Sequence, residues 1–272
     1  MDNNNYYDDE YNDEIALKTG KNLKELFKQD QLKYFQHRSV DFWHKSFPVL
    51  ASTMTKEQIE HLALDSMKRA EYWNGKTERE IWYYMIPIGY FGFFFDIDPQ
   101  YIDLRKAANW DDNEELYFNR IHAFLDQIDI NLPIFQEDWT NFEEKMKYID
   151  DYYHTWNNTV ERSENQKKVY LEAIAEELFP RKWEILSLEA RSVTLETNLK
   201  RAENIGLPTR ESILYGLASL YFGFAFERSP VFPWAAVLID TKLSPEKRVK
   251  SFIKNSELFF AQLIDAILKQ KH

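Results

Sequence analysis

The sequence contains no cysteine, and it is poor in the two residues that interrupt regular structure, with 7 glycines and 9 prolines among 272 residues. The absence of cysteine excludes disulfide bonds, thiolate metal sites and cysteine nucleophiles. The scarcity of glycine and proline disfavours a strand-rich fold, which needs many tight turns, and favours long helices with short connections. Because 44% of the residues are hydrophobic and 16% are aromatic, the chain has ample material for a packed core.

A long uncharged apolar run is also missing. The longest one spans residues 81–95 and contains Pro87, Gly89 and Gly92. At about fifteen residues it is shorter than the roughly 18 to 20 that a membrane-spanning helix requires, so we expect a buried core helix and no membrane insertion. Residues 1–10 have neither the basic start nor the apolar stretch of a secretory signal, and we therefore expect a cytoplasmic protein.

The chain has fewer basic than acidic residues. The chain has 34 lysines and arginines against 45 acidic residues, which gives a net charge of -11. Such a balance repels the phosphates of nucleic acids and attracts basic surfaces. We therefore expect no nucleic-acid partner, whereas a protein partner with a basic surface fits the charge.

The most informative feature is an internal repeat, which appears when the sequence is compared with itself at an offset of 132 positions. Lys-Arg-Ala-Glu occurs at residues 68–71 and again at 200–203, and Tyr-Phe-Gly-Phe occurs at 90–93 and, after the loss of one residue, at 221–224. The other matching pairs are Phe47-Pro48 with Phe179-Pro180, Thr77 with Thr209, Ile81 with Ile213, Tyr83 with Tyr215, Phe95 with Phe226, Asp96 with Glu227 and Pro99 with Pro230. This colinear series predicts two diverged copies of one helical unit.

Each copy is predicted to contain three helices and then a more variable last helix. The first helix ends at the Phe-Pro pair, the second follows a capping Thr or Ser, and the third becomes almost wholly apolar, so it should be the buried centre of its unit. The predicted ranges are 31–46 and 163–178 for the first helix, 55–72 and 187–204 for the second, starts at Thr77 and Thr209 for the third, and 113–129 and 245–269 for the last.

Between the copies, Pro133 predicts a loop over residues 131–135, and residues 137–158 have the pattern of a long, charged connecting helix. We predict an all-α fold in which two tandem diverged copies of a helical-bundle unit pack together. Its predicted parts are a mobile acidic tail (1–14), repeat unit 1 (15–132), the connecting helix (133–162) and repeat unit 2 (163–272).

Charged residues recur at matching places in the two copies. Arg69 and Arg201 lie on the second helices, and Asp96 and Glu227 close the third helices. We expect Arg69 to pair with Asp96 and Arg201 with Glu227, each pair fixing helix two against helix three. A carboxylate pair that acts as acid and base is the alternative, but one chain rarely needs two equivalent catalytic sites, so a structural role is favoured.

Gly92 and Gly223 lie inside aromatic runs that we expect to be helical, where glycine costs about 1 kcal/mol of helix stability. Close approach of another helix is the simplest compensation for this cost. Neither glycine has the sequence context of a phosphate-binding loop, so no nucleotide or other cofactor is predicted. Pro87 has no counterpart in the second copy and should bend its helix.

The patterns that would indicate an enzyme or a metal site are weak. None of the six histidines forms His-Glu-x-x-His, and His37 and His44, which share a predicted helix with Asp41, have no clear further ligand nearby. Asp96-x-Asp98 resembles the start of a calcium loop but lacks its glycine and terminal glutamate. No serine lies in a nucleophile elbow. We therefore predict no metal and no catalytic residue.

Two segments combine tyrosines with acidic side chains, a mixture suited to contact with a basic protein surface. The candidate partner-binding residues are Tyr6, Tyr7, Asp8, Asp9 and Tyr11 near the N-terminus and Asp150, Asp151, Tyr152 and Tyr153 in the connecting helix. The alternative is a solubilising tail and a solvated helix face.

Residues 200–240, from Lys-Arg-Ala-Glu through Tyr-Phe-Gly-Phe to Phe-Pro-Trp and Asp240, resemble a motif of small helical proteins encoded in bacterial type VI secretion loci. A weaker version occurs at residues 68–101. The general character of the chain is also similar to that of helical immunity proteins of bacterial polymorphic toxins. The resemblance implies a place beside secretion spike and effector genes, but it does not indicate a mechanism.

These observations lead to three hypotheses. The first is an immunity protein that binds and neutralises a cognate antibacterial toxin, such as a basic nuclease, by protein–protein contact in the cytoplasm. The second is an adaptor or chaperone that loads an effector onto a type VI secretion apparatus. The third is an enzyme with an unrecognised helical site, which would require a cleft of convergent polar groups inside one bundle.

Overall fold

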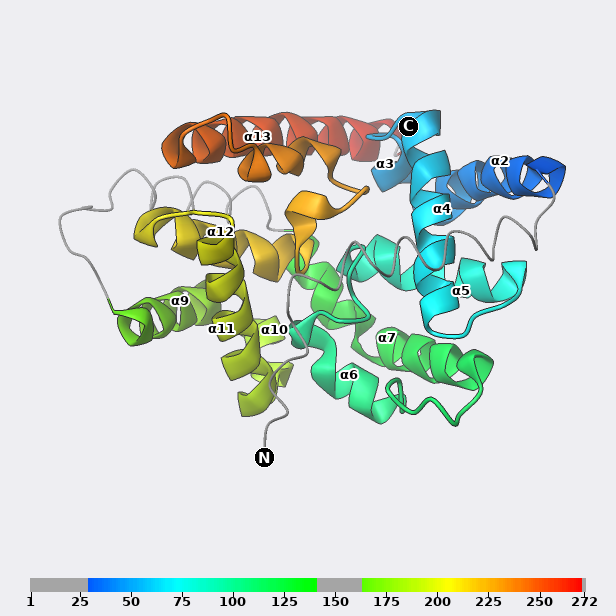
Figure 1. The fold of residues 1–272 in the computed structure, drawn as a ribbon, viewed down its shortest axis with the longest axis horizontal. Coiled ribbons are helices and arrows are strands. Elements are labelled where there is room, and N and C mark those ends of the chain that lie inside the picture. Colours follow the sequence, from blue (N-terminus) through cyan, green and yellow to red (C-terminus); the bar gives the residue numbers. More distant parts are fainter. Residues whose placement is uncertain (1–28, 141–162, 271–272) are drawn as a thin grey trace.

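The computed structural model describes residues 29–140 and 163–270, and these residues form α-helices and short 3₁₀ helices without a β-strand (Figure 1). The first half contains α2 (Gln29–Ser46), α3 (Pro48–Ala51), α4 (Lys56–Tyr72), α5 (Glu78–Phe91), η2 (Pro99–Tyr101), α6 (Ile102–Ala107) and α7 (Tyr117–Thr140). The second half contains α9 (Glu164–Leu178), α10 (Pro180–Ile185), α11 (Leu188–Asn204), α12 (Thr209–Phe222), η3 (Phe226–Arg228), η4 (Pro233–Ile239) and α13 (Pro245–Gln270). The predicted all-α class is confirmed.

Helix starts are fixed by side chains that satisfy the first backbone N–H groups. Thr55, Thr77 and Ser163 each form a capping box with the residue three positions later, and Ser187 accepts a hydrogen bond from the N–H of Ala190. These hydroxyl residues are the ones from which the sequence predicted the starts of α4, α5, α9 and α11. In contrast, α12 follows Pro208, which offers no side-chain cap.

Elements of the two halves correspond in length and spacing. Helices α4 and α11 both have 17 residues, and α5 and α12 both have 14. A phenylalanine precedes the proline that opens both α3 and α10. These parallels support the prediction of two tandem copies, which a superposition of the two halves would test.

The correspondence extends to the last helix of each half, where the sequence similarity had faded. In α7, Arg120 Nη2 donates to the carbonyl oxygen of Trp73 at 2.8 Å, and in α13, Arg248 Nη1 donates to the carbonyl oxygen of Ile205 at 2.7 Å. Trp73 and Ile205 are the C-terminal caps of α4 and α11. The same two guanidinium groups also bind the carbonyl groups of Trp110 and Leu238, respectively. Each arginine therefore places a positive charge at the C-terminal end of the second helix of its half, where the partial negative charge of the carbonyl groups makes a cation favourable.

The third helices end earlier than the sequence suggested. Gly92 and Gly223 were expected inside a helix, but they follow the last residues of α5 and α12 with φ values of 88° and 91°. That backbone region is open almost only to glycine, so each helix must stop there. Asp96 and Glu227 consequently lie beyond the helices, Asp96 in a turn and Glu227 in η3.

The predicted loop over residues 131–135 was wrong, because α7 continues through Pro133 to Thr140. A proline within a helix removes one backbone hydrogen bond and strains the preceding turn, but it does not abolish the bonds on either side. The carbonyl group that loses its usual helical N–H donor is that of Asp129, an exposed residue. The predicted boundary between unit 1 and the connecting helix, at 132/133, therefore falls inside α7, and residues 141–162 lie outside the described part.

The start of α7 also differs from the prediction. The helix was expected from Asn113 but begins at Tyr117, because residues 111–116 form an exposed turn. Within this turn the N–H of Glu114 donates to Asp112 Oδ1 at 2.9 Å. An Asx turn of this kind competes with the helical hydrogen-bond pattern and delays the start of the helix.

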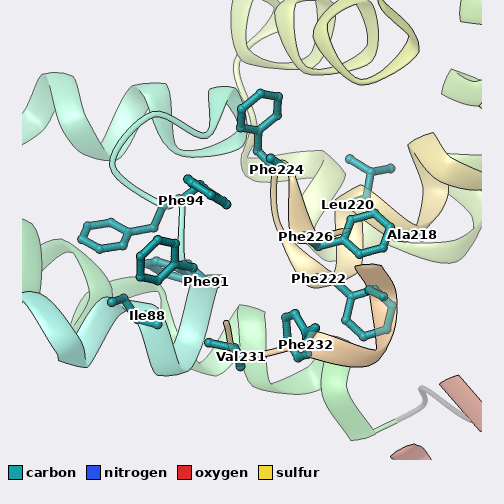
Figure 2. Close-up of a cluster of buried hydrophobic side chains, with 14 of the residues drawn as sticks. Ile88, Phe91, Phe94, Ala218, Leu220, Phe222, Phe224, Phe226, Val231 and Phe232 are labelled. Atoms are coloured by element: carbon teal, nitrogen blue, oxygen red, sulfur yellow. The ribbon is translucent and has the colours of Figure 1, made fainter. Parts of the chain in front are cut away.

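The two halves meet through the ends of α5 and α12. A Cβ atom on Gly92 would lie 2.5 Å from the carbonyl oxygen of Phe222, and a Cβ atom on Gly223 would lie 2.5 Å from that of Phe91. The backbones are therefore in direct contact, as the expected close approach required. Figure 2 shows the apolar side chains around this contact, with Phe91 and Phe94 on one side and Phe222, Phe224 and Phe232 on the other. We call this contact region the glycine joint.

Packing around the glycine joint is reciprocal. Helix α7 of the first half packs against α10 of the second, and α13 of the second half packs against α3 of the first. Figure 1 shows α13 extending along one edge of the molecule until its C-terminal end lies beside α3. Mutual contacts of this kind are typical of an interface between two similar units related by a two-fold axis. Of the described helices, none is both long and apolar enough to span a lipid bilayer.

The glycine joint predicts the effect of three substitutions. Gly92→Ala and Gly223→Ala should each lower the free energy of unfolding by about 3 kcal/mol or more, because the new methyl group is strained and also meets a carbonyl oxygen. Gly206→Ala is the matched control: φ is 74°, but the nearest atom to the new Cβ is the Arg248 side chain at 3.6 Å. It should cost only about 1 to 2 kcal/mol. Urea unfolding measures all three, and equal losses would contradict the role of the joint.

Candidate functional site

The residues that the sequence proposed for partner binding lie outside the part of the chain that the structure describes. They are Tyr6, Tyr7, Asp8, Asp9, Tyr11, Asp150, Asp151, Tyr152 and Tyr153. Their role stays a prediction. The candidate site must therefore be assembled from polar, aromatic and charged groups in residues 29–140 and 163–270.

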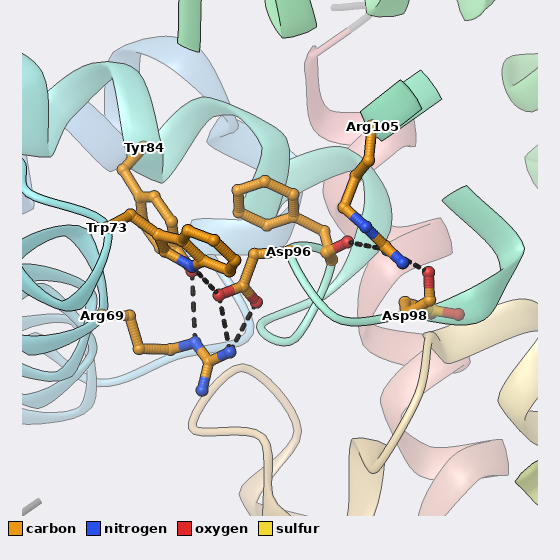
Figure 3. A network of polar contacts seen from close by, with 7 residues as sticks. Arg69, Trp73, Tyr84, Asp96, Asp98 and Arg105 are labelled. Atoms are coloured by element: carbon orange, nitrogen blue, oxygen red, sulfur yellow. Dashed lines mark hydrogen bonds and ion pairs between the residues drawn. The ribbon is translucent and has the colours of Figure 1, made fainter. Parts of the chain in front are cut away.

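Both predicted ion pairs are present in the structure. Arg69 Nη2 donates to both carboxylate oxygens of Asp96 at 2.6 Å, and Trp73 Nε1 donates to Asp96 Oδ2 at 2.6 Å (Figure 3). Arg69 Nε donates to the Tyr84 hydroxyl oxygen at 3.2 Å. Asp96 is 1% exposed, so its charge depends on these donors for stabilisation.

In the second half, Arg201 Nε and Nη2 donate to Glu227 Oε1 at 2.8 and 2.5 Å, and the Tyr215 hydroxyl donates to Glu227 Oε2 at 2.7 Å. Burial, together with the negative charge of Glu227, raises the pKa of Tyr215 well above its usual value. The tyrosine that corresponds to Tyr84 is thus Tyr215, one position away from the alignment with Tyr83 that the sequence suggested. Both clusters are closed and internally satisfied, which favours a structural role.

A third polar cluster lies beside the glycine joint. Asp98 is 1% exposed and accepts hydrogen bonds from the N–H groups of Phe224 at 2.7 Å and Gln100 at 2.9 Å. Gln100 Nε2 and Lys182 Nζ donate to the carbonyl oxygens of Ser219 and Leu220, respectively, near the end of α12. Burial raises the pKa of Asp98, and the N–H donors oppose this only in part. The cluster links the halves and satisfies helix-end carbonyl groups.

An open groove of about 570 Å³ lies between α2 and α5. It is lined by Arg38, Phe42, Thr77, Glu78, Arg79, Trp82, Tyr83 and Ile86. The Arg38 guanidinium lies 4.3 Å from the centroid of the Trp82 ring. The Phe42 ring is stacked on the Trp82 ring, with 6.1 Å between the two ring centroids. We call this feature the Trp82 groove.

Aromatic packing continues from the Trp82 groove to the start of α7. Arg79 Nε donates to the Tyr83 hydroxyl oxygen at 2.9 Å. The Tyr83 ring lies 6.1 Å from Phe118 and 4.5 Å from His122. Phe118 is 38% exposed and Leu116 is 69% exposed, so an apolar surface extends beyond the groove.

Next to this apolar surface lies an acidic loop, residues 111–115, in which Asp111, Asp112, Glu114 and Glu115 are all exposed. Glu115 Oε1 accepts from the N–H of Leu116 and from Asn119 Nδ2, which fixes the loop to the start of α7. The side chains of Asp111 and Glu114 have no hydrogen-bond or ion-pair partner among the described residues. Trp, Tyr and Arg side chains beside an exposed charged rim are typical of protein interfaces.

No family model, curated protein or solved structure matches this chain. The assignment of this surface therefore depends on its own geometry. Within residues 29–140 and 163–270, no group of three His, Asp or Glu side chains is arranged to hold a metal ion. His37, His44 and Asp41, which share α2, belong to no such group.

The sequence reasoning missed the Trp82 groove and the acidic loop. The four carboxylates within residues 111–115 were visible in the sequence, but the predicted helix began at Asn113 and so included the second half of this segment. The Trp82 groove depends on Arg38 and Phe42 of α2 lying beside α5, and no local pattern predicts that contact. The helical spacing of Glu78, Trp82 and Ile86 was a usable signal, since it places them on one face.

The buried ion pairs predict a contrast between two neutralising substitutions. Glu227→Gln leaves the Arg201 charge buried, with 9% of its side chain exposed, and should lower the free energy of unfolding by about 3 to 5 kcal/mol. Asp265→Asn removes an exposed ion pair with Lys269 and should leave stability nearly unchanged. Denaturant unfolding of both variants checks this, and a loss for Glu227→Gln no larger than for Asp265→Asn would contradict it.

Asp98 predicts a pH dependence. The pKa of Asp98 is raised in the folded state above its unfolded value of about 3.9, so protonation of Asp98 stabilises the folded protein. This stability is fully present below the unfolded pKa and is lost as the pH rises through the folded pKa. The free energy of unfolding of the natural protein, minus that of Asp98→Asn, should therefore fall as the pH rises above about 3.9. Urea unfolding at a series of pH values measures this difference. A difference that increases with pH would show that the folded pKa is lowered.

Proposed function

We propose that this protein acts by binding another protein and, more specifically, that it is an immunity protein that neutralises a cognate antibacterial toxin in the cytoplasm. The observation that supports the proposal is the exposed acidic loop, residues 111–115, beside the exposed side chains of Leu116 and Phe118 and the Trp82 groove. This surface combines negative charge with apolar area, and both contribute to association.

The two kinds of surface would act at different stages of binding. Four carboxylates within five residues, on a protein of net charge -11, attract a basic partner and accelerate encounter. Exposed aromatic and aliphatic side chains then lose contact with water, which stabilises the complex after encounter. A nuclease fits the role of partner because its substrate site must be basic to bind phosphates, and a run of carboxylates can occupy the same site.

The proposal requires no catalytic residue in this chain. The buried carboxylates Asp96, Asp98 and Glu227 are all committed to internal donors, and none of the three lines the Trp82 groove. These three carboxylates therefore have a structural role, because their hydrogen bonds hold the helices together. The resemblance of residues 200–240 to helical proteins of type VI secretion loci suggests the genomic setting for this proposal and carries no argument about the binding itself.

The direct test is co-expression with the toxin encoded next to this protein's gene. We expect a complex of fixed stoichiometry in size-exclusion chromatography and rescue of growth in cells that produce the toxin. A complex without growth rescue, combined with loss of effector secretion on deletion of the gene, would favour the adaptor role. Absence of both a complex and rescue would end the immunity proposal.

The acidic loop predicts a charge effect on this complex. Asp111→Lys with Glu114→Lys should weaken toxin binding about tenfold or more, mainly through slower association, and the effect should shrink at high salt. The matched control, Glu176→Lys with Glu257→Lys, makes the same change in net charge at exposed positions of α9 and α13. Association rates measured by surface plasmon resonance at two salt concentrations distinguish an effect of the acidic loop from an effect of net charge. Equal effects of the two double variants would mean that overall charge, and not this loop, governs binding.

A further inference from the structure

The charge on the Trp82 groove is opposite in sign to the charge of the whole protein. Its lining includes two arginines, Arg38 and Arg79, and one acidic residue, Glu78. Arg38 Nη1 lies 3.0 Å from Glu78 Oε1, so this pair is compensated. Arg79 is exposed and forms no ion pair with any described carboxylate. One guanidinium therefore remains uncompensated at the edge of an aromatic groove, on a chain of net charge -11.

Both arginines lie against aromatic rings. Arg38 Nη1 is already engaged by Glu78 and Arg79 Nε by the Tyr83 hydroxyl, so the terminal Nη groups of Arg79 are the ones without a partner among the described residues. Arg38 stacks over the Trp82 ring at 4.3 Å, and Arg79 lies 5.3 Å from the Tyr83 ring centroid and 5.8 Å from that of Phe118. Stacking uses the face of a guanidinium, and the N–H groups around its edge still point outward. A planar edge held in this way binds a carboxylate with little loss of side-chain entropy.

The lining has the geometry of a helix-binding surface. Residues 38 and 42 of α2 form one row of side chains four positions apart, and residues 78, 82 and 86 of α5 form another. Rows at this spacing produce the grooves into which the ridges of a neighbouring helix pack. The row on α5 runs from residue 78 to residue 86, which is eight steps and about 12 Å at the rise of an α-helix, or roughly two turns of a bound helix.

The central part of the corresponding face in the second half is buried. At an offset of 131 positions, three lining residues of α5 have counterparts on α12: Trp82 corresponds to Ile213, Tyr83 to Leu214 and Ile86 to Leu217. All three counterparts on α12 are buried, whereas the three residues on α5 are only partly buried. At these three positions the helix face is covered in the second half and partly open in the first.

From these observations we infer that the Trp82 groove binds an amphipathic helix of the protein partner, one that presents apolar side chains to Trp82 and Phe42 and a carboxylate to Arg79. The inference deepens the proposed function and rests on it, because the bound helix is assigned to the same partner. The acidic loop binds basic groups of that partner and the groove binds an acidic one, so two contacts of opposite sign fix its orientation.

The test uses two synthetic peptides and does not require the natural partner. Both are helical 14-residue peptides with leucines at positions i, i+3, i+4 and i+7; one carries glutamates beside the leucines and the other carries lysines at those positions. Fluorescence anisotropy with the full chain should show that the glutamate peptide binds more tightly. Equal affinity for the two peptides, or binding of neither, would overturn the inference.

Charge reversal makes the test specific to the site. Arg79→Glu should weaken binding of the glutamate peptide about fivefold to tenfold and strengthen binding of the lysine peptide, whereas Lys254→Glu, an equal charge change on α13, should do neither. Trp82→Ala should weaken binding of the glutamate peptide about thirtyfold. Circular dichroism confirms that each variant is folded. Unchanged affinity in both Arg79→Glu and Trp82→Ala would place the peptide elsewhere on the molecule and overturn the inference.

One further variant identifies a competing occupant. Residues 1–14 contain six acidic residues and no lysine or arginine, so this segment of the chain has the charge that the groove requires. If the glutamate peptide binds only after these six residues are changed to their amides, the groove belongs to the chain's own segment and the inference is overturned. Peptide binding and toxin binding are measured separately, so failure of the groove contact is distinguishable from failure of the immunity proposal.

Discussion

The arrangement of the molecule depends on a contact between backbones. Helices α5 and α12 end against each other at the glycine joint, where the space beside each glycine is filled by the last carbonyl group of the opposite helix. A side chain on either residue would separate the two helices. Each side of the joint is backed by packed aromatic rings, Phe91 with Tyr101 and Phe124 in the first half and Phe222 with Phe232 and Phe260 in the second. Because such packing tolerates little displacement, a small separation at the joint would be transmitted through the core.

Polar groups around the joint provide partners for the carboxylates buried there. Asp96 and Glu227 each receive an arginine from the second helix of their own unit, and a tyrosine of the third helix completes each cluster. Arg105 Nη1 donates to the carbonyl oxygen of Asp98 in the turn that follows (Figure 3). Ion pairs of this kind contribute little net stability, but they penalise any arrangement in which the helices shift relative to one another.

The local features of the fold were accessible from the sequence, and the non-local ones were not. Thr55, Thr77, Ser163 and Ser187 marked helix starts because their hydroxyl groups act on N–H groups two or three residues away. The ion pairs were predictable because an arginine and a carboxylate occur at matching places twice in the sequence. In contrast, the carbonyl oxygen of Phe222, which lies against Gly92 in the structure, is 130 residues away in the sequence, and no local pattern showed that the two helices end against each other. The Trp82 groove was missed for the same reason.

The reciprocal packing of the last helices has a consequence for how the molecule unfolds. Helix α7 packs on α5 and α6 of the first half and also on α10 of the second, and α13 packs on η4 of the second half and also on α3 of the first. Neither half therefore completes its own surface without the other. Melting of one half exposes apolar side chains on the other, so the two should lose structure together in a single cooperative transition. A repeat protein whose units only touch end to end would instead melt unit by unit.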